Sequence, residues 1–448
     1  MRLRHVVTCF LERETDGTVL LGRRSGDVST YQARWAGISG SVEENTPLQQ
    51  AYREIEEETG LSPDQVDLKA KGWPIRFADW ELGTVWVVHP YLFLCKTPAE
   101  VRHDWEHVQF QWISPHDISE LHAVPQLHEA YLSVDRAHRA GGSYGSEDIF
   151  QMVAKDQSHG AAELGLWTLM GLRAALLEAE GCESPSEILD MLSNKCRKAA
   201  DLRPSMAPPL SAALEAFRTF QGAFADSNRS LEESIDRAER DLDDRIQSRE
   251  QAPLDAARAA TECFRAGAYV VTLSYSFTVL ATLQEAADKI GKVIVGESRP
   301  ACEGRRTARA AASLGLETEL RTDAAAAAAC AESDVVLLGV DSLTADGRVI
   351  NKIGSLAMSW MAYCYGNEVI AVTTTDKLLP EGRDATMEEM SSDELGDPIE
   401  GVTIRNPYFE PVPADMIDHL ITEEGLTADE DRRHLHERLE SVYNELFE

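Results

Sequence analysis

The residues with the clearest capacity for chemistry are three closely spaced glutamates. In a helix, Glu54, Glu57 and Glu58 stand at positions i, i+3 and i+4, so they project from one face. Ionised carboxylates at this spacing repel one another unless a cation lies among them, and oxygen ligands suit Mg²⁺ or Mn²⁺. Arg53 can hold one of the carboxylates in position, and Gly60 is placed to end the helix in a left-handed C-cap. The spacing therefore predicts a metal site.

These residues match the core of the Nudix box, which reads arginine, glutamate, aliphatic, any residue, two glutamates, any residue, glycine and aliphatic. The chain resembles a Nudix hydrolase here, and Gly40-Ser41-Val42-Glu43 is similar to the glycine loop and first glutamate of the motif. The loop is one residue short, and Asn45 stands where the box usually has another glutamate. The alternative is a solvated acidic helix in an acid-rich chain. The resemblance implies metal-dependent hydrolysis of a nucleoside diphosphate linked to another group.

A second stretch, residues 105–112, resembles the late Nudix strand and the loop before it. Glu106 in this loop is an additional metal ligand, a base for the attacking water, or a plain surface residue, and the sequence leaves these alternatives open.

The elements that must position these residues are strands. Apolar and β-branched runs at 5–11 and 18–21 flank a Thr15-Asp16-Gly17 turn and predict a hairpin, and further strands are predicted at 72–77, 84–95 and 108–113. The resemblance implies an α/β/α sandwich over residues 1–138. The glycine-rich segment 138–146 predicts a flexible joint and the first domain boundary.

Beyond this joint the apolar residues recur with a helical period, which predicts a helical subdomain over residues 147–250. Ser184 and Glu187 have the capping-box spacing, and a charged helix is predicted from Ser230 to about Arg249. From residue 251 to 448 strand-like runs alternate with helical stretches. That alternation predicts a Rossmann-like domain with a parallel, doubly wound sheet.

Polar residues fall at the predicted carboxyl ends of these strands, where such sheets bind ligands. The candidates are Ser274, Glu297, Arg299 and Asp341, followed by Asn351 and Lys352 in the next loop. Arg299 and Lys352, with Arg305 or Arg306, can hold phosphate, helped by the amides of a helix starting after Ser276. Asp341 is a sugar-hydroxyl acceptor, a proton-transfer group, or a turn cap.

At these positions the chain also resembles the translation initiation factor 2B α/β/δ family, which includes ribose-1,5-bisphosphate isomerase and methylthioribose-1-phosphate isomerase. The matching stretches are Arg203-Pro204-Ser205, Glu297-Ser298-Arg299-Pro300, Gly339-Val340-Asp341-Ser342, Asn351-Lys352-Ile353-Gly354 and Thr422-Glu423-Glu424-Gly425. The resemblance spans roughly residues 147–446 and implies a ligand site that includes Arg203, and a homo-oligomer formed through this part.

In the isomerases of this family a cysteine at the first strand end and the aspartate that matches Asp341 transfer the protons. Here Ser274 stands in place of that cysteine, and a hydroxyl is a much weaker acid than a thiol. Cys302 follows the second strand end and is read as a small residue that begins a helix.

The amino-acid composition limits the classes of binding partner that are expected. The chain has 448 residues and a formal net charge of −33, with Lys scarce and Arg supplying most of the positive charge. Such an acidic composition is typical of a protein adapted to a salty cytoplasm, and its net charge argues against DNA or anionic lipid as a partner. The eight cysteines contain no CxxC pair, and neither a signal peptide nor a membrane-spanning run is recognised, so a reduced, cytoplasmic location is expected.

Three hypotheses follow. The leading one is a Mg²⁺- or Mn²⁺-dependent hydrolase of a nucleoside diphosphate derivative, whose second part binds a sugar phosphate or nucleotide. The second is an active sugar-phosphate isomerase, and the third is a non-catalytic binding module related to the initiation factor.

Overall fold

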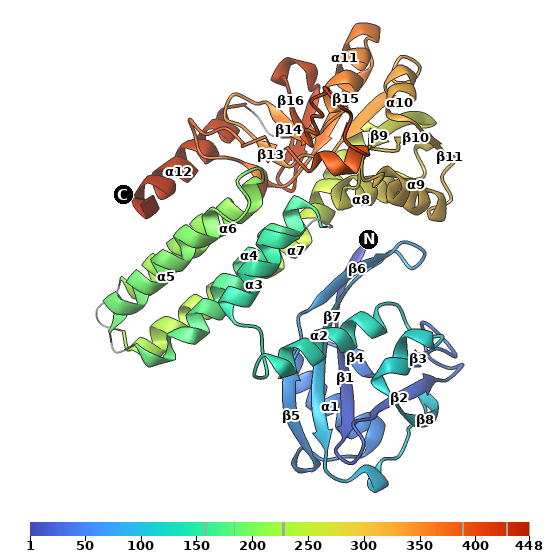
Figure 1. Ribbon diagram of the computed structural model, residues 1–448, viewed down its shortest axis with the longest axis vertical. Coiled ribbons are helices and arrows are strands. Elements are labelled where there is room, and N and C mark those ends of the chain that lie inside the picture. The colour runs from blue at the N-terminus through green and yellow to red at the C-terminus, as the bar shows by residue number, and fades with distance from the viewer. Residues whose placement is uncertain (157–158, 183, 226–228, 388, 427–428, 448) are drawn as a thin grey trace. The chain divides into compact units, whose positions relative to one another are not determined.

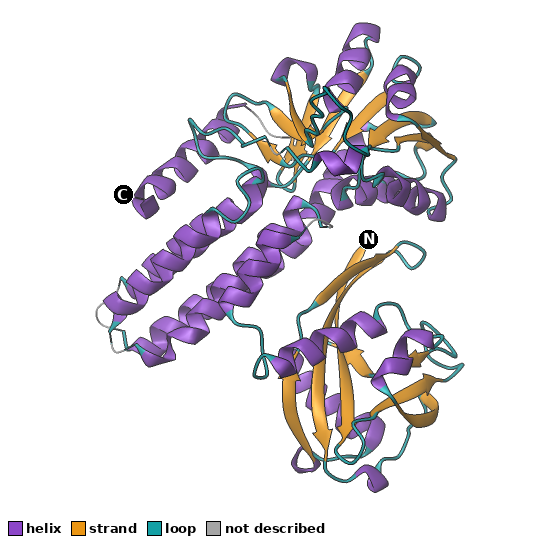
Figure 2. Ribbon diagram, viewed as in Figure 1, coloured by secondary structure: helices purple, strands orange, loops and turns teal. Residues whose placement is uncertain are grey.

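The computed structural model describes the whole chain except residues 157–158, 183, 226–228, 388, 427–428 and 448 (Figure 1). The chain divides into two compact units, one of residues 2–144 and one of residues 145–448 together with Met1. Figure 2 shows that helices and strands are mixed in the first unit, whereas the second begins with a long all-helical part.

A mixed sheet forms the centre of the first unit. β1 (Arg2–Arg13) pairs in parallel with β7 (Thr84–Cys95) along its whole length, and antiparallel with β2 (Val19–Arg24), which confirms the predicted hairpin. The other strands are β3 (Trp35–Ala36), β4 (Ile38–Ser41), β5 (Val66–Lys71), β6 (Ile75–Asp79) and β8 (His107–Ile113). β5 had not been predicted, and the strand expected at 72–77 begins three residues later.

Two helices cover the two faces of this sheet. Successive residues of a strand point to opposite faces, so Cys9 packs in one core with Ile55 of α1 (Pro47–Thr59). Its neighbour Phe10 packs in a second core with Val134 of α2 (Leu127–Arg139). The first unit is therefore the α/β/α sandwich that was expected.

The second unit starts with a helical bundle. Its helices are α3 (Ser146–Lys155), α4 (Ala161–Leu177), α5 (Pro185–Ala200), α6 (Ala207–Phe224) and α7 (Leu231–Ala260). Ser184 caps α5 by accepting a hydrogen bond from the Glu187 N–H, as its spacing predicted. α7 continues past its expected end through Pro253, so the boundary proposed at 250/251 lies inside this helix.

A parallel sheet with the strand order β11-β10-β9-β12-β15-β17-β18 follows, and only its last strand is antiparallel. The strands are β9 (Ala268–Leu273), β10 (Ile290–Gly296), β11 (Thr318–Arg321), β12 (Val335–Leu338), β15 (Glu368–Val372), β17 (His419–Thr422) and β18 (Gly425–Leu426). The helices are α8 (Phe277–Glu285), α9 (Gly304–Ser313), α10 (Asp323–Ala329) and α11 (Ser355–Tyr365). This arrangement confirms the Rossmann-like prediction.

Two features of this unit were not predicted. A small antiparallel sheet joins β13 (Ser342–Leu343), β14 (Val349–Lys352) and β16 (Phe409–Val412). Asn351 and Lys352 therefore lie in a buried strand, and their assignment to a loop was wrong because their strand partner is distant in sequence. The last helix, α12 (Asp429–Phe447), returns to the helical bundle, where Val442 and Leu446 join its core.

Candidate functional site

Capping residues in the local sequence define both ends of α1, the helix that carries the three glutamates. Thr46 and Gln49 form a reciprocal capping box, and Pro47 occupies the first turn, where a missing N–H costs nothing. Gly60 ends the helix with φ 73°, the left-handed cap expected from the sequence. Ala51 and Ile55 are buried against the sheet, which fixes the rotation of the helix and hence the direction of its carboxylates.

Glu58 is the most enclosed of these carboxylates, with 3% of the residue exposed. Its Oε1 accepts a hydrogen bond of 3.1 Å from the Ser39 N–H. Its Oε2 is buried and has no hydrogen-bond partner among the residues that the structure describes. An ionised carboxylate in such a place is costly unless a proton or a cation balances it.

Glu54 is held from two sides. A Cβ on Gly40 would lie 1.6 Å from Glu54 Oε1, so the position requires glycine for steric reasons. Asn45 Nδ2 donates to Gln50 Oε1 at 2.8 Å, and Gln50 Nε2 donates to Glu54 Oε1 at 2.6 Å. Asn45, the departure from the Nudix box, thus supports Glu54 through Gln50.

Glu57 is more open than its neighbours. Its side chain is 54% exposed, and its Oε1 accepts from Arg53 Nε at 2.7 Å, the supporting contact that was expected of this arginine. Glu106 lies half-buried in the loop before β8. The structure thus brings Glu54, Glu57, Glu58 and Glu106 to one region of the first unit.

The carboxylates influence one another electrostatically. Burial, followed by the charges of Glu54 and Glu106, holds the pKa of Glu58 well above its usual value. Burial also raises the pKa of Glu54, with further contributions from Glu57 and Glu106, and raises that of Glu106. Such mutually repelling groups bind a divalent cation well.

Several features of this site fit a hard cation. All the donors are carboxylate oxygens, one of them is buried and accepts no hydrogen bond from the residues that the structure describes, and a glycine makes room for another. Among the described residues, however, no three side chains of the ligating types already surround a common point. The types of donor atom thus fit Mg²⁺ or Mn²⁺, but the described side chains do not yet surround one common point.

His107 is a neighbour of this site that the sequence did not reveal. It is 3% exposed, and its Nδ1 lies 3.7 Å from Glu58 Oε2 and 3.3 Å from Asp104 Oδ1. Burial lowers its pKa, more than Asp104 raises it. A Cβ on Gly22 would lie 2.2 Å from the ring, so the imidazole fills a close-fitting space. In the sequence, the one feature that could have pointed to His107 is its position directly after Glu106.

In the second unit, the predicted residues Ser274, Glu297, Arg299 and Asp341 follow the carboxyl ends of β9, β10 and β12. Ser276 caps α8 through the Val279 N–H, as expected for the helix after the first of these strands. The amides of Ser298 and Arg299 donate to Asp323 at 2.7 and 2.9 Å.

Ser274 and Lys352 meet at a residue that was not predicted. Ser274 has φ 61°, and its Oγ donates to Glu303 Oε1 at 3.2 Å. Lys352, 3% exposed, places its Nζ 2.8 Å from the same oxygen. Glu303 lies in a polar stretch of the sequence that gave no sign of a buried contact. The fold brings it to Ser274 and Lys352.

The other predicted residues have separate surroundings. Glu297 pairs with Arg305 at 3.9 Å, and Arg299 is exposed. The Asp341 N–H donates to Ile350 O, which places the aspartate beside β14, and Asn351 Nδ2 donates to Ser355 Oγ at 2.9 Å. Arg203 lies between α5 and α6, where its Nη1 donates to the Asp156 carbonyl at 2.7 Å.

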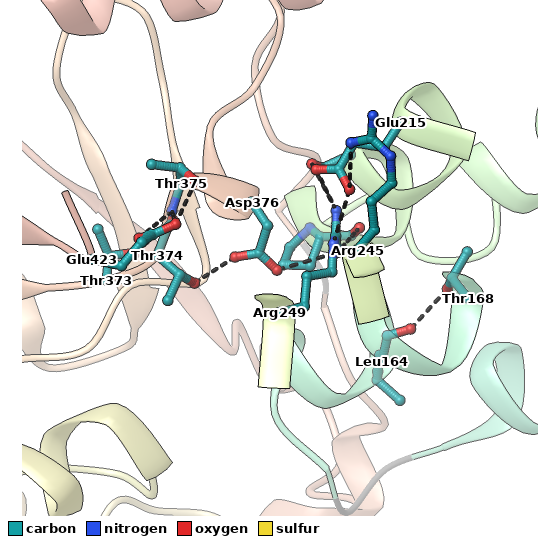
Figure 3. Close-up of polar contacts among 12 residues, drawn as sticks. Leu164, Thr168, Glu215, Arg245, Arg249, Thr373, Thr374, Thr375, Asp376 and Glu423 are labelled. Atoms are coloured by element: carbon teal, nitrogen blue, oxygen red, sulfur yellow. Dashed lines mark hydrogen bonds and ion pairs between the residues drawn. The ribbon is translucent and has the colours of Figure 1, made fainter. Parts of the chain in front are cut away.

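A polar cavity of about 110 Å³ lies at the ends of β15 and β17, facing α6 and α7. Figure 3 shows the polar contacts among residues at and around it. The buried Arg249 pairs there with Glu215 at 3.1 Å and Asp376 at 3.3 Å. Glu423 accepts from the Thr375 N–H, and burial raises its pKa. Glu423 belongs to the stretch Thr422-Glu423-Glu424-Gly425, which resembled the initiation factor family, and Arg249 lies in the charged helix that was predicted.

Comparisons with known proteins agree with this division. The model of the initiation factor 2 subunit family matches residues 157–429, and the NUDIX domain model matches residues 2–133. The ribose 1,5-bisphosphate isomerase of Methanocaldococcus jannaschii is 26% identical over 288 residues, which cover 62% of this chain and 90% of that protein. The enzyme of the same name from Haloferax volcanii is 33% identical over 189 residues, 39% of this chain and 58% of its own length, so this match spans little more than half of that relative.

Two solved structures share the fold of the second unit. The translation initiation factor eIF-2B of Pyrococcus horikoshii aligns with a TM-score of 0.53 at 24% identity, covering 63% of this chain and 96% of its own. The 5-methylthioribose 1-phosphate isomerase of Pyrococcus horikoshii aligns with a TM-score of 0.52 at 20% identity, covering 68% and 87%. From these matches the chain belongs to the initiation factor 2 subunit family and carries a NUDIX domain at its N-terminus.

Proposed function

We propose that the NUDIX domain hydrolyses a nucleoside diphosphate derivative with Mg²⁺ or Mn²⁺ as cofactor. The observation that carries this proposal is Glu58, whose buried Oε2 has no hydrogen-bond partner among the described residues. Glu54 is seated beside it against Gly40, and burial, followed by the charge of Glu54, raises the pKa of Glu58. A carboxylate kept in this position is useful when a cation binds it.

Each side chain of the proposed site has a stated role. Glu54, Glu57 and Glu58 hold the cation, and Arg53 keeps Glu57 in place. When bound, the cation neutralises charge that develops on the diphosphate oxygens. Glu106 either adds a ligand or accepts the proton of the attacking water, and its position near Glu54 supports both roles.

Turnover of a substrate panel tests this proposal. ADP-ribose and related diphosphates, supplied with Mg²⁺ in high salt, should release a nucleoside monophosphate. Glu57→Gln should lower kcat by about a hundredfold or more, because it removes a ligand charge. Glu56→Gln is the matched control, since Glu56 is an exposed residue of the same helix. Absence of turnover across the panel, or equal losses in both variants, would refute the proposal.

For the second domain, binding of a sugar phosphate or nucleotide is the function that its strand ends support best. Arg299 and Arg306 are exposed there, and Asp341 follows β12 at the same edge. The bound ligand would act as a regulator of the first domain. Loss of binding of ribose 5-phosphate in Arg299→Ala combined with Lys352→Ala, measured by calorimetry, tests this role, and unchanged binding would contradict it.

Sugar-phosphate isomerisation is the second candidate for this domain, because relatives named ribose 1,5-bisphosphate isomerase match it. Ser274 argues against it, since its hydroxyl stands where a thiol is needed. We expect no conversion of ribose 1,5-bisphosphate. Conversion that disappears in Asp341→Asn would instead establish the isomerase and overturn the reading of Ser274.

The second domain also offers a surface for self-association. On α11, Trp360 and Tyr363 are 52% and 60% exposed, and large exposed aromatic residues favour protein contacts. We expect a homo-oligomer, measurable by light scattering, whose mass falls towards that of one chain in Trp360→Glu.

Within the described ranges, no helix is long and apolar enough to cross a bilayer.

A further inference from the structure

The start of α9 fixes a carboxylate inside the candidate ligand site of the second domain. A Cβ on Gly304 would lie 1.9 Å from the carbonyl oxygen of Gly296, so the first turn of α9 is pressed against the end of β10. Glu303 precedes this glycine and has a side chain that is 20% exposed. Its position is therefore set by backbone packing and not by a mobile loop.

Glu303 makes two polar contacts through one oxygen. Oε1 accepts from Ser274 Oγ at 3.2 Å and lies 2.8 Å from Lys352 Nζ. Oε2 is buried and has no hydrogen-bond partner in the described part of the chain. A buried acceptor without a partner costs free energy, so this oxygen is suited to a donor brought by a ligand.

The charge of Lys352 is already balanced. Glu303 supplies an anion at ion-pair distance, and the Lys352 Nζ also lies 3.8 Å from the centroid of the Tyr408 ring. A phosphate placed at Lys352 would have to displace Glu303 or sit beside its negative charge. Either arrangement is unfavourable, because like charges placed side by side repel one another.

We propose that Glu303 determines the specificity of this site, so that it selects a sugar monophosphate and rejects a sugar bisphosphate. A hydroxyl of the sugar donates to Glu303 beside Lys352, and the single phosphate is left to the exposed arginines of the same edge, Arg299 and Arg306. Lys352 then positions Glu303 and does not bind phosphate. This inference rests on the proposed ligand-binding role of the second domain and names the ligand class within it.

Calorimetric titration of the full chain with ribose 5-phosphate and ribose 1,5-bisphosphate tests the inference. The wild-type protein should bind the monophosphate more tightly. Glu303→Gln keeps the size of the side chain and removes its charge, so it should shift the ratio of the two affinities toward the bisphosphate by about tenfold or more. Glu332→Gln makes the same charge change at an exposed position and should leave the ratio unchanged.

The outcomes separate the two proposals. If the wild-type protein binds these ligands but Glu303→Gln leaves the ratio unchanged, or if the wild type already prefers the bisphosphate, the role of Glu303 is wrong while the ligand site stands. If a protein with a normal thermal unfolding transition binds neither sugar phosphate, the ligand site itself fails, and Glu303 with it. An equal shift in Glu332→Gln would show a nonspecific charge effect and would also overturn the inference.

Discussion

Replacing Gly40 by alanine should damage catalysis without unfolding the NUDIX domain. The new Cβ would lie 1.6 Å from Glu54 Oε1, 2.0 Å from Cδ and 2.7 Å from Cγ. Because real contacts stay above about 3 Å, the carboxylate has to move by more than about 1 Å. Misplacement by about 1 Å costs about a hundredfold in rate, which corresponds to about 2.7 kcal/mol of activation free energy.

The assay compares kcat/KM for diphosphate hydrolysis with thermal unfolding of the same samples. Glu54 is the end of a flexible chain, so the free energy of unfolding should fall by only about 1–2 kcal/mol. Gly26→Ala is the matched control, because no atom lies within 4 Å of a Cβ built there. Wild-type turnover in Gly40→Ala, or an equal loss in Gly26→Ala, would refute the reasoning.

Three further predictions concern stability. Burial and neighbouring carboxylates raise the pKa of Glu58 above its ordinary 4.5, so the folded metal-free protein binds more protons than the unfolded chain. Its free energy of unfolding should therefore fall as the pH rises from 4.5 through the raised pKa. Urea titrations in EDTA should show that Glu58→Gln removes this pH dependence. The same pH dependence of the unfolding free energy in wild type and variant would contradict the prediction. Arg249→Met removes the cation that pairs with the buried carboxylate of Asp376 and with the partly buried Glu215, so it should cost about 3–5 kcal/mol in urea unfolding, against less than about 1 kcal/mol for Arg237→Met at an exposed position of the same helix. Equal costs in the two variants would show that the ion pairs of Arg249 are unimportant for stability. The net charge of −33 predicts that Tm rises between about 0.1 and 2 M KCl as the Debye length shrinks from about 10 Å, and a flat profile would argue against salt adaptation.

Local sequence signals predicted the elements that depend on neighbouring residues. The C-cap at Gly60, the cap at Ser184 and the spacing of the glutamates on α1 all follow from a few adjacent positions. The strand ends at Ser274 and Asp341 were predicted because apolar runs give way there to polar residues. These signals were enough for the α/β/α sandwich and the parallel sheet.

Features that depend on distant contacts could not be predicted in the same way. Lys352 lies in a strand because β14 pairs with β16, more than fifty residues along the chain. Pro253 removes a helical hydrogen bond, yet α7 continues because its neighbours Ala252 and Leu254 are buried. Glu303 has no local mark of function, and only the packing of α9 on β10 brings it to Lys352.

Binding of Mn²⁺ to the metal-free protein, followed by electron paramagnetic resonance, tests most directly whether the carboxylates of α1 form a cation site. The wild-type protein should bind Mn²⁺, and Glu58→Gln should weaken the affinity by about tenfold or more, while Glu56→Gln leaves it unchanged. No binding by the wild-type protein, or equal affinity in Glu58→Gln, would contradict the proposed site.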